Sequence, residues 1–208
     1  MTRPNYFLML EELSKSACEA VSIACAHPLS GEKSGASASH GTGKTKSKEK
    51  DKERLCEIRQ RGDKMICGLE DSLFSDFIPP LQRDNIAALA HGFWRIISRA
   101  SDHFNTSPCR QNGGVQNDEE RLCVVLCEKL MQNTAMLREI RNPEKTPSLT
   151  EFRATLRRAG EAHSAYLSQI SAGVVPRSCA LRAFSTARLR VEISRCFDGL
   201  IEVKLGNI

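Results

Sequence analysis

FIPPLQRDNIAALA, residues 77–90, marks the end of one helix and the start of the next. Proline lacks an amide hydrogen and its ring clashes with the preceding turn, so Pro79 and Pro80 stop the helix that reaches them. After the prolines, apolar residues return every three or four positions, as they do on one face of a helix. This stretch predicts two helices joined by a short turn, a basic unit of a helical bundle.

Apolar residues follow the same helical period on both sides of this junction. A helix is predicted from Leu55 up to the two prolines, and the next one runs from Ile86 to Phe104. Four further helices are predicted over residues 6–24, 122–140, 152–170 and 181–203. Because no stretch needs a sheet to explain its pattern, the predicted fold class is all-α, a bundle of six helices.

The predicted helices fall into a three-plus-three order. Helix 1 occupies residues 1–27, and helices 2 and 3 occupy residues 51–108. Residues 118–208 hold helices 4 to 6. Between helices 1 and 2, residues 28–50 lack large apolar side chains beyond their start and are rich in Ser, Gly and Lys, so we predict a flexible linker there.

Composition narrows the class of protein. The chain has 208 residues, 40% hydrophobic and 26% charged, as soluble globular proteins do. No segment approaches the run of about 20 apolar residues that crosses a bilayer, and Glu11 and Glu12 interrupt the apolar start of the chain. We therefore predict a cytoplasmic protein that is at most peripheral to the membrane.

The chain has nine cysteines without a CxxC pair. Their scatter predicts reduced thiols rather than a disulfide framework. Cys123 and Cys127 could share a helix face, either as small core residues, the favoured reading, or as ligands of a soft metal. The five histidines form no ligand-spaced pair and no nucleophile has a recognisable signature, so we predict that the protein is not an enzyme.

A short pattern occurs twice, at equivalent places in the two halves. Residues 59–63 read RQRGD and residues 157–161 read RRAGE, which gives Arg-x-x-Gly-acid on helix 2 and again on helix 5. A duplicated three-helix unit explains the recurrence, because each copy would place the pattern on its middle helix.

With these features, and above all the junction at residues 77–90, the sequence resembles the PhoU-like family, in the branch that accompanies Pit-type phosphate permeases. The resemblance implies a six-helix PhoU-like bundle built from two three-helix repeats. It also implies a phosphate permease as partner, and it leaves a homo-oligomer open.

The resemblance further implies metal clusters held by acidic residues, and here the sequence departs from the family. The acidic pair on helix 2 is replaced by Arg59 and Asp63, and the pair on helix 5 by Arg157 and Glu161. On helix 3, Trp94 and Ser98 stand where the family has acids, and on helix 6 Arg188 falls near such a position. We therefore predict degenerate metal sites with Asp63 and Glu161 as remnants, and an i,i+4 ion pair in each motif.

Residues 153–195 hold eight arginines and no lysine. Arginine favours bidentate contacts to phosphate or carboxylate groups. The candidates for an anion or partner surface are Arg157, Arg158, Arg188, Arg190 and Arg195. An ordinary solvated helix face is the competing interpretation.

The function predicted from the resemblance is that of a non-catalytic accessory or regulator of inorganic phosphate transport that acts on a Pit-type permease. The alternative is a basic helical module that binds nucleic acid or another anionic partner, which the absence of a recognised nucleic-acid motif disfavours. A metal-storage or metal-dependent protein is a third class, and the missing acids argue against it.

Overall fold

A computed structural model describes residues 5–26, 42–75, 79, 81–106, 118–139 and 149–206 of the chain. These residues form six α-helices and two short 3₁₀ helices, and no strand occurs among them. The α-helices are α1 (Tyr6–Ala26), α2 (Thr42–Ser75), α3 (Arg83–Asn105), α4 (Asp118–Ala135), α5 (Leu149–Ser171) and α6 (Ala180–Leu205). The 3₁₀ helices η1 (Met136–Glu139) and η2 (Arg177–Cys179) flank α4 and α6. The predicted all-α fold is confirmed.

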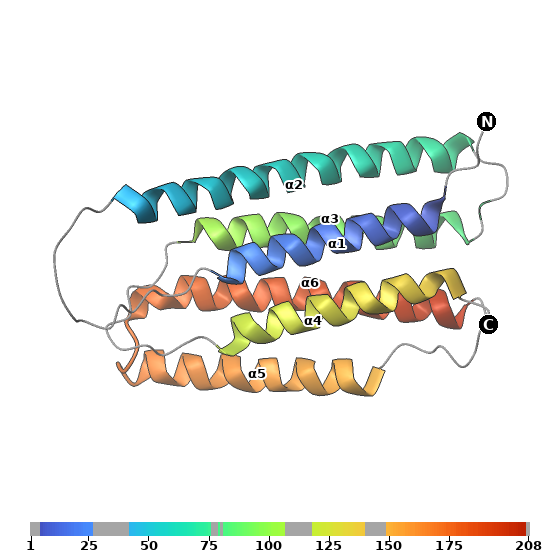
Figure 1. The fold of residues 1–208 in the computed structure, drawn as a ribbon. Coiled ribbons are helices and arrows are strands. Elements are labelled where there is room, and N and C mark those ends of the chain that lie inside the picture. Colours follow the sequence, from blue (N-terminus) through green and yellow to red (C-terminus); the bar gives the residue numbers. More distant parts are fainter. Residues whose placement is uncertain are drawn as a thin grey trace.

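Four helices form the centre of the bundle. α1, α3, α4 and α6 pack together, whereas α2 lies against α1 and α3, and α5 lies against α4 and α6 (Figure 1). α2 and α5 are therefore on opposite outer sides. Each outer helix contacts the first and third helices of its own half, which agrees with the predicted three-plus-three order. Duplication of a three-helix unit stays a prediction.

The junction at residues 77–90 divides two helices as predicted. α2 ends at Ser75 and α3 begins at Arg83, with Gln82 as its N-cap residue. Pro79 lies between them. The helix break therefore includes Pro79, as the missing amide and the ring clash of proline predict.

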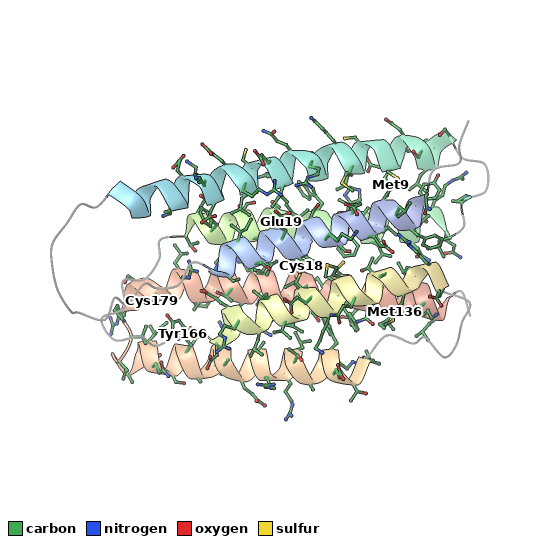
Figure 2. All side chains as sticks on the ribbon, viewed as in Figure 1. Met9, Cys18, Glu19, Met136, Tyr166 and Cys179 are labelled. Carbon is green, nitrogen blue, oxygen red and sulfur yellow. The ribbon has the colours of Figure 1, made fainter. Side chains whose placement is uncertain are left out.

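Apolar side chains fill the space between the four central helices. Leu10, Phe93 and Phe197 are among the largest fully buried side chains. The rings of Phe152 and Phe197 stack with centroids 3.6 Å apart, which fixes α5 onto α6. Cys18 on α1 is within hydrogen-bonding reach of Cys127 on α4, and Figure 2 places Cys18 on the side of α1 that faces α4. Cys123 and Cys127 are both buried core residues.

The predicted linker is partly wrong. α2 extends back to Thr42, so residues 42–50 are helical, while residues 28–41 lie outside the described part of the chain. The physical reason is that Lys and Glu are good helix formers even where nothing can be buried. Once Leu55 and Ile58 anchor α2 in the core, upstream residues add hydrogen bonds to an existing helix without a new nucleus.

The prediction of reduced thiols is wrong for one cysteine. Cys179, in η2, is disulfide-bonded, whereas the described cysteines of α1 to α4 and Cys196 of α6 are free. Sequence spacing could not reveal this bond, because a disulfide is decided by the approach of two Cα atoms in the fold.

Within the described residues, no helix combines the length and the apolar character that spanning a bilayer requires.

At Gly92, α3 approaches α6 closely. A Cβ atom at this position of α3 would lie 2.8 Å from Cys196 Sγ and 3.3 Å from its Cβ on α6. Glycine is therefore required by packing here, although it weakens a helix intrinsically.

We predict that Gly92→Ala lowers the free energy of unfolding by about 1–3 kcal/mol, the usual cost of overpacking a core. Urea denaturation followed by circular dichroism measures it. Gly68→Ala is the matched control: nothing lies within 4 Å of the added Cβ. That variant should be more stable than the wild type by about 0.5–1 kcal/mol. Equal effects of the two substitutions would contradict the packing argument.

Candidate functional site

In the first half, the predicted metal position is closed by a tryptophan. Trp94 Nε1 on α3 donates a hydrogen bond of 2.6 Å to Asp63 Oδ1 on α2. A Cβ atom at the neighbouring Gly62 would lie 3.4 Å from Ile97 and 3.8 Å from the Trp94 ring. Because glycine lacks this atom, these two side chains have space beside α2. One carboxylate oxygen of Asp63 thus accepts a hydrogen bond from an indole instead of binding a cation.

The ion pair predicted between Arg59 and Asp63 is not formed. Both residues are described, and no salt bridge between them occurs in that part of the structure; Asp63 bonds Trp94 instead. An indole that reaches over from α3 is a longer-range partner than an i,i+4 neighbour, and sequence spacing on one helix does not reveal it. The prediction is wrong for this motif.

In the second half, the corresponding position is closed by an arginine. A Cβ atom at Gly160 of α5 would lie 3.7 Å from Arg190 Nη1 of α6. Beside it, Arg157 Nη1 and Glu161 Oε1 are 3.6 Å apart, so the predicted i,i+4 pair is present, with both side chains largely exposed. An exposed pair of this kind contributes about 0.2–0.5 kcal/mol. Arg190 is the arginine that lies against this glycine, whereas Arg188, which the resemblance places near an acid position of helix 6, is exposed.

These two positions do not fit a carboxylate-bridged metal cluster. Each offers one carboxylate, Asp63 or Glu161, that already has a hydrogen-bonding or ionic partner in the protein. A guanidinium next to the second position repels any cation. In the described part of the chain, no group of three or more His, Cys, Asp or Glu side chains could hold a metal ion.

Beneath the second position lies a buried polar network that the sequence analysis missed. Glu119, in the first turn of α4, is fully buried. Its Oε1 accepts a hydrogen bond of 2.9 Å from Arg190 Nε, and its Oε2 lies 2.8 Å from His163 Nδ1. One carboxylate thus joins α4 to α5 and α6.

The next residue, Glu120, points to different partners. It accepts two hydrogen bonds from Arg182 of α6, from Nε at 2.6 Å and from Nη2 at 3.0 Å, and this pair is buried. The fully buried His103 of α3 places its Nε2 3.5 Å from Glu120 Oε1, too long for a good hydrogen bond. Neither ring nitrogen of His103 has a hydrogen-bond partner among the described residues.

Opposing effects act on the pKa of Glu120. Burial favours the neutral acid and raises the pKa, but the contacts with His103 and Arg182 outweigh burial, so the pKa lies below its usual value. A carboxyl group with a depressed pKa stabilises the fold above its unfolded-state pKa of about 4.3. That stabilisation is lost as the pH falls through the folded-state pKa.

The five candidate surface arginines do not form one surface. Arg190 is mostly buried and paired with Glu119, which corrects its prediction as a surface residue: its partner is 71 positions away in sequence. Arg157 and Arg195 are exposed but paired, with Glu161 and Glu192. Arg158 and Arg188 are exposed, on α5 and α6 respectively.

Arg158 lines a groove between α4 and α5 of about 620 Å³. Its walls carry two acids, Asp118 and Glu161, and two bases, Arg121 and Arg158, over an apolar floor that includes Leu122 and Val125. Equal numbers of opposite charges give the groove no preference for anions. The geometry therefore does not concentrate the arginines into a phosphate-binding or nucleic-acid surface, and that alternative stays a prediction.

No model of a protein family matches the chain, and no curated protein does. Two solved structures from Shewanella oneidensis MR-1 are similar. A PhoU-like protein matches with a TM-score of 0.72 and 12% identity over 97% of this chain and 99% of that chain. A proposed PhoU-like phosphate regulatory protein matches with a TM-score of 0.72 and 11% identity over 98% and 100% of the respective chains. The predicted PhoU-like fold is thus confirmed.

We predict that Glu120→Gln lowers the free energy of unfolding at pH 7 by about 3 kcal/mol, because Arg182 would keep a buried charge without its counterion. The loss should shrink as the pH is lowered from 7 through the depressed folded-state pKa of Glu120, because the wild-type carboxylate then becomes protonated as well. Chemical denaturation across this pH range measures both effects. Glu161→Gln, in an exposed pair, should change stability by less than about 0.5 kcal/mol and keep the wild-type pH profile; a similar cost for both would contradict the burial argument.

A second prediction uses Trp94, the single tryptophan of the chain. Asp63→Ala removes the carboxylate that accepts the indole hydrogen bond, so water replaces it and the fluorescence maximum should move to longer wavelength. The accompanying loss of stability should be about 1 kcal/mol. Asp71→Ala, an exposed position on the same helix, should leave the emission unchanged. An unaltered spectrum for Asp63→Ala would show that the indole is not held there.

Proposed function

We propose that the protein is a non-catalytic regulator of inorganic phosphate transport that acts on a Pit-type permease. Two observations support the proposal: the PhoU-like fold, and the similarity to a chain described as a PhoU-like phosphate regulatory protein. The sequence resemblance at residues 77–90 adds the Pit-type branch.

The proposal that the protein works without a bound metal rests on one observation: side chains of the protein itself occupy both Arg-x-x-Gly-acid positions. Trp94 bonds the remnant acid Asp63 in the first half, and Arg190 stands against Gly160 near the remnant acid Glu161 in the second. A hydrogen bond and a guanidinium now link the helices that a metal cluster would otherwise link. Regulation would therefore not depend on a bound metal.

A role without catalysis is supported by the way the buried titratable groups are used. Glu119, Glu120 and His163 contact other side chains of the bundle, so these groups serve packing between helices. We further propose that the protein works in the cytoplasm, bound peripherally at the inner face of the membrane through its permease. The free thiols of α1 to α4 are typical of a protein in a reducing compartment. The disulfide at Cys179 departs from this pattern.

The test is co-purification from native membranes with a tag at the C-terminus, combined with metal analysis of the membrane-free fraction. We expect a phosphate permease to co-elute, while iron and zinc stay far below one ion per chain after stripping and reloading. Deletion of the gene should change the rate of phosphate uptake by whole cells.

An unrelated tagged protein controls for non-specific capture of membrane proteins. Elution without any permease, together with unchanged phosphate uptake in the deletion strain, would contradict the regulatory role. Stoichiometric metal in the wild type would contradict the degenerate sites.

A further inference from the structure

One line of side chains along α6 faces away from the rest of the bundle. Its members are spaced alternately three and four residues apart over the whole helix, as the a and d positions of a coiled coil are. We call this line the α6 ridge, and it consists of Leu181, Phe184, Arg188, Val191, Arg195, Asp198, Glu202 and Leu205. All eight residues are exposed.

The α6 ridge is unusually apolar for a solvent-facing line. Leu181 is 67% exposed, Phe184 54%, Val191 39% and Leu205 68%. The opposite side of the same helix packs against the core, where residues such as Leu189 and Ile193 are fully buried. Exposed apolar side chains aligned on one helix face mark an interaction surface.

The charges of the α6 ridge are separated along the helix. Along the helix the two basic residues, Arg188 and Arg195, come first, and the two acids, Asp198 and Glu202, follow. Arg188, Asp198 and Glu202 have no ion-pair partner within the part of the chain that the structure describes. When the ridge is reversed about its centre, Asp198 takes the place of Arg188, so these two charges are complementary between antiparallel copies.

We infer that the α6 ridge binds the α6 ridge of a second copy of this chain, with the two helices antiparallel. In an antiparallel coiled coil, each a position meets a d position of the partner helix. One register gives the ridge both an apolar layer and an opposite-charge layer. It pairs Leu181 with Leu205, Phe184 with the stem of Glu202, Arg188 with Asp198, and Val191 with the stem of Arg195.

The twofold symmetry of such a dimer uses each contact twice, since the same patch serves both copies. Arg188 of each copy meets Asp198 of the other, so two equivalent ion pairs form. The exposed leucines at both ends of the ridge cover one another. The long stems of Arg195 and Glu202 can lie over apolar partners while their charged ends reach water.

The flanks of the α6 ridge are compatible with this approach. On the α3 side, Arg95 Nε and Arg195 Nη1 both lie 3.3 Å from Glu192, so these charges are partly neutralised within one copy. On the α5 side, Arg157 is paired with Glu161. A contact one helix wide is at the small end of specific interfaces, so we expect a dissociation constant of about 1–100 µM.

A membrane surface fits the α6 ridge less well. Arg188 lies between Phe184 and Val191 on the same line, so inserting the apolar side chains among lipid tails would also bury a guanidinium. In addition, Asp198 and Glu202 would face anionic headgroups. Both acids have a role in the self-complementary register and none at a membrane.

The inference is independent of the proposed function and is tested on the purified full-length chain alone. Sedimentation velocity over a concentration series should show a monomer–dimer equilibrium for the wild type. Arg188→Asp should raise the dissociation constant at least about tenfold, because it places like charges opposite each other at two equivalent contacts. Asp198→Arg should do the same.

The decisive sample is a mixture of the two single variants. A heterodimer of Arg188→Asp with Asp198→Arg contains two opposite-charge pairs, so mixing should restore association to near the wild-type constant. The double variant Arg188→Asp/Asp198→Arg should restore it within one chain. Arg121→Asp, an exposed arginine on α4, is the matched control and should dimerise like the wild type.

Circular dichroism melts establish that each variant is folded before association is measured. A wild type that stays monomeric at several hundred micromolar would overturn the inference, including the case in which it binds anionic phospholipid vesicles instead. Dimerisation that is unaffected by both charge reversals would overturn it too, since another surface would then form the dimer.

Discussion

Two adjacent carboxylates at the start of α4 constrain the bundle more than any other feature. Glu119 and Glu120 are both buried, and a buried carboxylate is tolerated only when cations and donors compensate for the lost hydration. Their partners come from three different helices: His103 from α3, His163 from α5, and Arg182 and Arg190 from α6. The positive end of the α4 dipole helps both charges. A shift of α6 by one turn would separate both arginines from their carboxylates, so these contacts select one register.

The network also explains how the second half of the chain uses its arginines. Arg190 serves two neighbours at once: its Nε bonds Glu119, and its Nη1 stands close to Gly160 of α5. The same place in the first half holds Trp94, whose indole bonds Asp63 near Gly62. In both halves a small residue on the outer helix makes room for a bulky side chain of its neighbour. The chemistry differs, an ion pair in one half and an indole hydrogen bond in the other, while the geometry is shared.

The sequence was sufficient for the helices and insufficient for the contacts between them. Helix periodicity and the Pro79-Pro80 break are local signals, so five helices and the position of the turn could be predicted closely. The start of α2 could not, because residues 42–50 lack the apolar period and are helical as an extension of an anchored helix. The partners of Glu119, His163 and Arg190, lie 44 and 71 positions away in sequence. The sequence of α4 does not indicate which arginine of the chain will contact this carboxylate. For the same reason the sequence does not distinguish Arg190, which is mostly buried, from Arg188 two positions away, which is exposed.

α6 carries apolar residues on two opposite faces. A helix that covers a core needs one apolar stripe, and a helix apolar all round is normally enclosed. α6 meets α3, α4 and α5 on its inner side, yet Leu181 and Leu205 on its outer side are each about two-thirds exposed. Chance exposure of single apolar residues is common, but here they share a 3-4 spacing with charged residues, two arginines followed by two acids. That order has no function in the isolated bundle. It acquires one when a second helix of the same sequence, running the opposite way, lies along it.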